Sequence, residues 1–401
     1  MRTPIVIVLG SSTYIHNYSK FLEDFNLNAK LLVIGKTKNP SVNLPENAIY
    51  LRISLKNSLS KIVSYCIKNN FSVKGVINRV DYFEVLHGQL AETFNVIGPT
   101  ASAVQDLSDK VRMHELMLQS DLSFYRPRTI ITTLNDAPTY FDQLQFPIVL
   151  KTHVGAKSRG VVSLKKPTDF EFAKEMMIEN MNDPEKDLIL IEQFLYGKQV
   201  APVMYVNKKG KVRVLALVDI VTAREEKQNH MQLIYRTTPS RHSERIRQKI
   251  TYVMQTLANA SGLKSVLLHP EFFVTGKHIF LIEVNVRMGG FREAMMLNAY
   301  NIDMNQLSWE LAMDLNISDQ MKKSDSCTAC EVWEPNSGKI KKLSIPKSKY
   351  ISSEKYHLKV GDKYIAPPQK QIPLATFFIS APDDSLIIAK KIRKKTVVEL
   401  R

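Results

Sequence analysis

Cysteine is scarce in this sequence of 401 residues, which contains only Cys66, Cys327 and Cys330. Three cysteines cannot build a disulfide framework, so we expect the chain to work in a reducing compartment. Cys327 and Cys330 form a CxxC pair, but a four-thiolate zinc site needs a second such pair, which the sequence lacks. Both thiols are therefore expected to be small strand residues.

Long apolar runs are also missing. The N-terminal apolar run from Ile5 to Leu9 is far shorter than the core of a signal peptide, and no stretch of about 18 apolar residues occurs in the chain. The sequence therefore predicts a cytoplasmic protein with no membrane partner.

Two glycine patterns of nucleotide-binding folds are absent. Gly10 follows the first apolar run, but the G-x-G-x-x-G fingerprint of dinucleotide-binding domains does not occur. The P-loop pattern G-x-x-x-x-G-K-[ST] is missing as well. A nucleotide site in this chain must therefore be built in another way.

Acidic residues are outnumbered, since 55 Lys and Arg against 39 Asp and Glu give a net charge of +16. The excess favours an anionic partner, either a nucleic acid or a nucleoside triphosphate with an acidic substrate. The aromatic residues lie mostly inside apolar runs and are not interleaved with arginine, which argues against nucleic acid. With 44% hydrophobic and 23% charged residues, the composition predicts a folded protein of two or three domains.

The first hundred residues alternate short apolar strands with amphipathic helices. Strands are expected at Ile5 to Leu9, Lys30 to Gly35 and Gly75 to Asn78, with a helix in Leu55 to Asn69. Continuous apolar strands are typical of a parallel sheet covered on both faces. We therefore predict an α/β domain over residues 1–108.

The central part of the chain is expected to be α+β. The predicted elements are helices at Ala101 to Leu107 and Asp109 to Gln119, strands at Arg128 to Ile131 and Phe146 to Lys151, a loop at Thr152 to Arg159, a strand at Gly160 to Leu164, a helix at Asp169 to Ile178, a strand at Asp187 to Gln193, two long strands within Val200 to Val221, a long loop at Arg224 to Arg241, a helix at Ser243 to Ala260, and strands at Val266 to Val274 and His278 to Val286. The tail after Lys322 is predicted to be a small β-rich domain.

The hairpin formed by residues 266–286 carries polar side chains at regular spacing. Two-residue alternation places Glu283, Asn285 and Arg287 on one face, and Glu271 on the preceding strand can face the same way. Carboxylate and amide oxygens suit Mg²⁺, which proteins hold with one or two carboxylates plus substrate phosphates. The neighbouring residues are apolar, so these carboxylates would be buried and would need a counter-charge.

Two other segments have weaker signals. Lys151 ends a buried strand and is followed by a loop with Gly155, Ser158 and Gly160, which can present an ammonium group and backbone N–H groups to phosphate. Taken alone, this loop is more often structural. Glu192 lies in a strand that can offer its edge to adenine, but by itself the segment is an ordinary strand and turn.

The order and spacing of these three segments, together with Asn95 to Thr100 leading into Ser108-Asp109-Lys110, resemble the ATP-grasp superfamily. The resemblance is to the branch of carboxylate-amine ligases, biotin carboxylase and carbamoyl phosphate synthetase, and covers about residues 4–310. It implies an ATP-grasp fold in which residues 109–320 form the ATP-grasp domain, with a lid at about 146–193. Residues 1–108 and 321–401 would be the N-terminal parallel-sheet domain and the small β-rich C-terminal domain.

The resemblance also implies ATP as cofactor, with Mg²⁺ as the metal ion and Mn²⁺ as an alternative. The implied phosphate contacts are Lys110 and Lys151, with the loop that contains Ser158 and Gly160 closing over them. Glu192 and Leu195 would hold adenine, and Gln199 stands where many relatives carry a ribose-binding glutamate. The implied metal ligands are Glu271, Glu283 and Asn285.

Enzymes of this kind transfer the γ-phosphate of ATP to a carboxylate and let an amine attack the acyl phosphate. The resemblance thus implies a ligase that joins small-molecule carboxylates and amines, with an amino acid as acyl substrate. Arg287 is expected to grip the acyl group beside the Gly290 backbone, or else to be a counter-ion to the two glutamates. Substrate selectivity is expected from Arg224 to Arg241, Phe291 and the C-terminal domain.

Three alternatives stay open at this point. One is a carboxylase or purine-pathway enzyme of the same superfamily that uses bicarbonate or formate. Another is a nucleotide-binding scaffold without turnover, and the third is a basic nucleic-acid binder. The sequence does not decide whether the chain forms a homo-oligomer.

Overall fold

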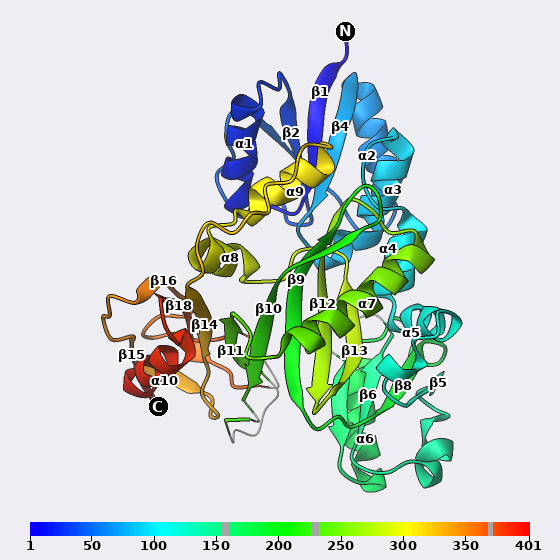
Figure 1. Ribbon diagram of the computed structural model, residues 1–401, viewed down its shortest axis with the longest axis vertical. Coiled ribbons are helices and arrows are strands. Elements are labelled where there is room, and N and C mark those ends of the chain that lie inside the picture. Colours follow the sequence, from blue (N-terminus) through cyan, green and yellow to red (C-terminus); the bar gives the residue numbers. More distant parts are fainter. Residues whose placement is uncertain (154–159, 224, 227–231, 368–371) are drawn as a thin grey trace.

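The computed structural model describes residues 1–153, 160–223, 225–226, 232–367 and 372–401 (Figure 1). Its N-terminal part is a parallel sheet with the strand order β3-β2-β1-β4. The apolar cores of β1 and β2 are fully buried, as expected for strands covered on both faces. The elements of this part are β1 (Thr3–Leu9), α1 (Tyr14–Asp24), β2 (Lys30–Gly35), β3 (Ala48–Arg52), α2 (Ser58–Lys68), β4 (Phe71–Asn78) and α3 (Glu84–Phe94).

His87 lies on the buried face of α3, where its Nε2 is 3.1 Å from the carbonyl oxygen of Val76. Burial lowers the pKa of His87 from 6.5 to about 4. Between these pH values the unfolded chain binds a proton that the folded chain does not. We therefore expect the contribution of neutral His87 to the free energy of unfolding to be fully present above pH 6.5. The free energy of unfolding should then fall by roughly 3 kcal/mol as the pH drops toward 4.

Urea unfolding across this pH range measures the effect. The variant His87→Gln should lose most of the pH dependence, whereas His16→Gln, on the exposed face of α1, should keep it. An unchanged slope in the His87 variant would contradict the assignment.

Two consecutive helices lead out of the N-terminal sheet. They are α4 (Ala101–Ser108) and α5 (Lys110–Gln119). Asp109 lies between them and caps α5, because its Oδ1 accepts hydrogen bonds from the backbone N–H groups of Val111 and Arg112 at 2.9 and 3.4 Å. The cap fixes Lys110 at the first position of α5, where its side chain is buried.

A separate four-stranded antiparallel sheet follows, with the order β5-β8-β6-β7. Helix α6 covers it, and both share an apolar cluster that includes Ile148, Leu150, Phe170 and Ile191. This is the compact α+β unit predicted for this part of the chain, drawn at the lower right in Figure 1. Its elements are β5 (Thr129–Thr133), β6 (Ile148–Thr152), β7 (Val161–Leu164), α6 (Phe170–Ile178) and β8 (Leu188–Gln193).

The centre of the molecule is an eight-stranded sheet with the order β13-β12-β9-β10-β11-β14-β18-β16. Alternation along β9 places Val200 and Met204 in the cluster with α7, and Val203 and Tyr205 in the cluster with α8 and α9. The sheet is thus covered on both faces. The elements are β9 (Lys198–Val206), β10 (Val212–Thr222), β11 (Leu233–Thr238), α7 (Glu244–Ser261), β12 (Val266–Thr275), β13 (His278–Asn285), α8 (Arg292–Tyr300) and α9 (Met304–Ala312).

The prediction of one long loop at 224–241 is wrong, because β11 lies within it. Thr237 pairs with Asp219 of β10 on one side and with Thr328 of β14 on the other. One partner of β11, β14, is distant in sequence, and β11 is short and partly polar. Local pattern alone therefore gave no sign of a central strand.

The C-terminal segment is rich in strands, as predicted, but three of them extend the central sheet. These are β14 (Ser326–Val332), β16 (Ile351–Tyr356) and β18 (Ala375–Ala381), whereas β15 (Gly338–Ser344), β17 (Lys363–Tyr364) and β19 (Val397–Leu400) form a small sheet of their own. Helix α10 (Ser385–Lys395) packs against β14 and β18. The central sheet is therefore continuous across residue 320, the predicted domain boundary. No helix in the described residues is long and apolar enough to span a lipid bilayer.

Candidate active site

The hairpin of β12 and β13 brings the predicted metal ligands together. Glu271 lies directly across from Glu283, and His269 across from Asn285, so the three oxygen-bearing side chains share one face. The Asn285 amide Nδ2 donates to Glu283 Oε1 at 3.2 Å. Glu271 Oε2 accepts a hydrogen bond from Gln199 Nε2 at 2.6 Å. The face predicted from the two-residue alternation is thus present in the structure.

Lys110 reaches this face from helix α5. Its Nζ lies 3.3 Å from Glu283 Oε2, and the lysine side chain is only 6% exposed. A buried ammonium beside a half-buried carboxylate supplies the counter-charge that the hairpin needs.

Lys151 forms the second buried ion pair. Its Nζ lies 2.6 Å from Glu192 Oε2, and His114 Nε2 lies 3.3 Å from the other oxygen of the same carboxylate. Burial would raise the pKa of Glu192, but the charge of Lys151 and the contact with His114 lower it to about 2. Glu192 of β8 is therefore an ionised acceptor at neutral pH, held between Lys151 of the neighbouring strand β6 and His114 of helix α5.

The two lysine segments are joined by a short polar link. His153, which follows β6, has its Nδ1 3.1 Å from Asp109 Oδ2, and the backbone N–H of Lys110 donates to the carbonyl oxygen of His153 at 3.0 Å. The hydrogen bond with Asp109 raises the pKa of His153. The start of α5 and the end of β6 are thus fixed relative to each other.

Four further residues were predicted to contact the nucleotide, and in the sequence they lie in or next to strands β6 to β9. Gly160 adopts φ +69°, and its carbonyl oxygen accepts from the Thr152 N–H at 3.0 Å across the base of the loop. Ser158 lies outside the described residues. Leu195 is partly buried in the turn after β8. Gln199 is buried and bonded to Glu271, so its role toward ribose stays a prediction.

Arg287 is held by carboxylates of the N-terminal part rather than by Glu271 or Glu283. Its guanidinium forms an ion pair with Asp81, and its Nε lies 3.5 Å from Glu84 Oε1. Burial lowers the pKa of Arg287 to about 10. The interpretation of Arg287 as a counter-ion to the two hairpin glutamates is therefore wrong.

Sequence reasoning missed several buried charged residues of this region. Asp81 and Glu84 follow the carboxyl end of parallel strand β4, a position where ligand-binding side chains often gather, and this signal could have found them. His114 and Arg292 gave no comparable sign, because single polar residues in apolar helices are usually surface residues.

Residues 144–294 match the ATP-grasp domain family. This chain contains an ATP-grasp domain. Among solved structures, the L-amino acid ligase from Bacillus licheniformis is similar over 100% of both chains, with a TM-score of 0.80 and 16% identity. The biotin carboxylase domain of the Hydrogenobacter thermophilus 2-oxoglutarate carboxylase, solved with MgADP, ADP and bicarbonate, has a TM-score of 0.71 and 15% identity over 100% of this chain and 91% of its own. The predicted ATP-grasp fold is confirmed.

One curated relative is the bifunctional purine biosynthetic protein purD of Dictyostelium discoideum. It is 28% identical over 197 residues, which are 48% of this chain and 24% of the relative. The chain spans between 24% and 39% of the lengths of the curated relatives it matches. The matched segment of the ATP-grasp family contains Lys151, Glu192 and the whole β12–β13 hairpin.

The ATP-grasp hairpin suits a metal ion that takes part of its ligands from a nucleotide. In the described part of the chain, no group of three His, Cys, Asp or Glu side chains is placed to hold a metal without help. Glu271, Glu283 and Asn285 instead offer two carboxylates and one amide oxygen on one face. This is the hard-oxygen set with which Mg²⁺ is held beside phosphate groups.

The two glycines after the hairpin differ in the space around them. A Cβ atom at Gly289 would lie 2.6 Å from His269 Cγ, whereas one at Gly290 would meet no atom within 4 Å. We expect Gly289→Ala to lower the free energy of unfolding by about 1–3 kcal/mol, because the His269 ring must move. Gly290→Ala should change it by less than about 0.5 kcal/mol. Urea unfolding of the two variants tests this, and equal losses would contradict it.

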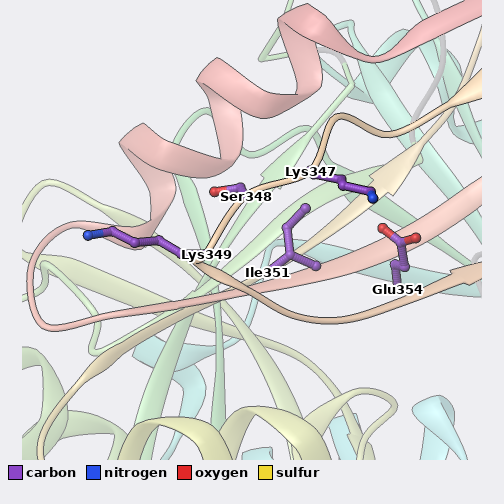
Figure 2. Close-up of a pocket in the computed structure, with 5 residues that line it drawn as sticks. All are labelled: Lys347, Ser348, Lys349, Ile351 and Glu354. Atoms are coloured by element: carbon purple, nitrogen blue, oxygen red, sulfur yellow. The ribbon is translucent and has the colours of Figure 1, made fainter.

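A hollow of about 460 Å³ lies elsewhere, on the C-terminal segment. Figure 2 shows its lining residues, Lys347, Ser348, Lys349, Ile351 and Glu354. None of them belongs to the β12–β13 hairpin or to the ion pairs of Lys110, Lys151 and Arg287. The hollow is therefore not part of the candidate active site.

Proposed function

We propose that this chain is an ATP-dependent carboxylate-amine ligase that forms an amide or peptide bond through an acyl phosphate and releases ADP and phosphate. The observation that carries the proposal is the meeting of Lys110, from helix α5, with the Glu271–Glu283 face of the hairpin. An ammonium group and two carboxylates converge where a metal-bound polyphosphate could be held. The second lysine, Lys151, lies in the adjacent sheet and is linked to the start of α5 through His153.

The nucleotide would be bound by residues of several strands, helix α5 and two loops. Lys110 and Lys151 would contact the phosphates, with Gly160 and Ser158 in the covering loop. Glu192 and Leu195 would hold adenine, and Gln199 would reach the ribose. Glu271, Glu283 and Asn285 would hold Mg²⁺, or Mn²⁺ in its place, and the ion would neutralise charge on the transferring phosphoryl group.

The acyl substrate would lie beside Arg287 and the Gly290 backbone. A planar guanidinium can bind a carboxylate with two parallel hydrogen bonds and can keep binding the acyl phosphate that replaces it. The Gly290 backbone is open to a ligand, because no atom lies within 4 Å of where a side chain would begin. We infer that both substrates are small molecules and that the acyl substrate is an amino acid, as in the name of the similar L-amino acid ligase.

A second candidate is an enzyme of purine biosynthesis, or a carboxylase, from the same superfamily. It is favoured by the curated relative named as a purine biosynthetic protein and by the structure solved with bicarbonate. The two candidates share the ATP site and differ in the carboxylate that is activated.

An ADP-release screen separates them. The purified chain is assayed with ATP and Mg²⁺ against single amino acids, pairs of amino acids, bicarbonate and formate, and products are identified by mass. We expect ADP release that depends on an amino acid pair, together with the mass of a dipeptide. Release that depends only on bicarbonate or formate would favour the second candidate, and no release with any compound would contradict both.

We further propose that residues 146–193 form a lid over ATP. The base of its loop is closed by the hydrogen bond from the Thr152 N–H to Gly160, so exchange of this amide reports on closure. Hydrogen exchange in peptides covering 146–164 should slow when nucleotide and Mg²⁺ are added. Peptides covering β1 serve as the control, since they should not respond. If the exchange rate in residues 146–164 is the same with saturating nucleotide as without it, the lid does not close over ATP.

A further inference from the structure

Arg292 is a buried arginine that forms no ion pair with any described residue. It is the first residue of α8, and it is 2% exposed. Its Nη1 lies 3.6 Å from the Met295 sulfur, and its Nε has no hydrogen-bond partner among the described residues. Burial removes the hydration of the guanidinium group, and a weak contact to a thioether sulfur does not compensate for this loss. The side chain is therefore expected to have a partner that the chain itself does not supply.

The surroundings of Arg292 are cationic. Burial and the nearby charges of Arg236 and Arg287 lower its pKa to about 9, and only Glu271 acts in the opposite direction. Arg236 lies over the Phe291 ring, with 4.7 Å from its Cζ to the ring centroid. An anion bound beside Arg292 would therefore contact two arginines, Arg292 and Arg236, next to the β12–β13 hairpin.

The other two arginines have carboxylate partners in the chain. Arg236 pairs with Glu331 through one nitrogen at 3.2 Å, and Arg287 pairs with Asp81 and Glu84. Among the described residues, Arg292 is thus the member of this group that forms no ion pair with a carboxylate. Its position also differs from that of Arg287, because it follows the Gly289-Gly290 turn rather than preceding it.

We propose that Arg292, assisted by Arg236, binds a second anionic group on the acyl substrate, so that the substrate of this ATP-grasp site is an acidic amino acid. The proposal rests on the proposed ligase function. The activated carboxylate lies at Arg287 and Gly290, on the hairpin side of the turn. The second anionic group, a carboxylate or a phosphate, lies on the α8 side of the turn and neutralises the positive charge of Arg292.

A purely structural role for Arg292 has little support in its contacts. A buried arginine that stabilises a fold donates to backbone carbonyls or carboxylates with several of its five N–H groups. Arg292 has one contact to a sulfur atom instead. Helix α8 also packs against β14, the strand that carries Glu331, and against β18 of the C-terminal segment (Figure 1).

The test compares charged substrates with uncharged isosteres. ADP release is measured with L-aspartate against L-asparagine, L-glutamate against L-glutamine, and L-phosphoserine against L-serine, each with a panel of amine partners. We expect at least tenfold higher kcat/KM for the charged member of one pair. The first two pairs detect a second carboxylate and the third detects a phosphate.

Variants assign the preference to Arg292. Arg292→Met should abolish the discrimination within the preferred pair, and Arg292→Lys should keep part of it. The control is Arg213→Met, an exposed arginine of β10 whose loss should change neither substrate preference nor turnover. If Arg292→Met does not fold, the charge preference of the wild-type chain and the partial retention in Arg292→Lys still decide the question.

Each outcome bears on one of the two proposals. Equal use of charged and uncharged members would overturn the role of Arg292 and leave the ligase function standing. Turnover of other amino acids, with none of these six compounds active, would have the same consequence. ADP release with no carboxylate at all would instead contradict the ligase function.

Discussion

Replacing Glu283 with glutamine should lower the turnover of this ATP-grasp site by about a thousandfold or more. Glutamine keeps the size of the side chain but removes a charge from the hairpin face that we propose to bind Mg²⁺, where Glu283 lies across from Glu271. The change also leaves the ammonium of Lys110 buried without the carboxylate that lies 3.3 Å away. We therefore expect weaker binding of Mg²⁺ and ATP together with the loss of turnover.

ADP release and the Mg²⁺ dependence of nucleotide binding measure this effect. Glu354→Gln is the matched control, because Glu354 lies on the exposed strand β16 and should be replaceable without loss. Wild-type turnover in the Glu283 variant would show that the hairpin does not hold the catalytic metal, whatever the remaining residues do.

Arg287→Met should bind ATP with near-normal affinity but form no acyl product. Supplying hydroxylamine as the amine converts the acyl phosphate to a hydroxamate, which gives a direct readout of the acyl step. Because the substitution removes the ion pair with Asp81, we also expect some loss of stability. Near-normal ATP affinity distinguishes a missing substrate clamp from a damaged nucleotide site.

Asp81→Asn separates the two functions of Arg287. It removes the ion pair to the N-terminal part but leaves the guanidinium in place to bind substrate. We expect this variant to lose some stability and to keep forming hydroxamate. If Asp81→Asn and Arg287→Met lose hydroxamate formation equally, then Arg287 acts only by joining the two parts of the chain. Hydroxamate formation at the wild-type rate in Arg287→Met would rule out the clamp.

Local patterns predicted those parts of the site that are close in sequence. The alternation of Glu283 and Asn285 along one strand, and the turn that sets Glu271 across from Glu283, are short-range features, and the structure has them. The pairing of Lys110 with Glu283 joins residues far apart in the chain. The resemblance to the ATP-grasp superfamily assigned Lys110 to the phosphates and Glu283 to the metal ion, but it did not predict that they form a pair.

Other features depended on contacts that no local pattern encodes. Strand β11 was missed because its two neighbours come from β10 and β14, and the partners of Arg287 were missed because they come from the N-terminal sheet. Arg292 was missed for a different reason. Its importance lies in a buried Nε that has no hydrogen-bond partner in the described structure, and a sequence cannot show which buried polar groups lack a partner.

The position of β11 inside the central sheet has a consequence for engineering the chain. Removal of the residues after 320 would take away β14 and leave one side of β11 with unpaired N–H and C=O groups. Such an edge, flanked by buried apolar residues, readily pairs with other chains and leads to aggregation. A shortened chain is therefore a poor vehicle for studying the ATP site, and domain exchange with relatives should keep β11, β14 and β18 from the same parent.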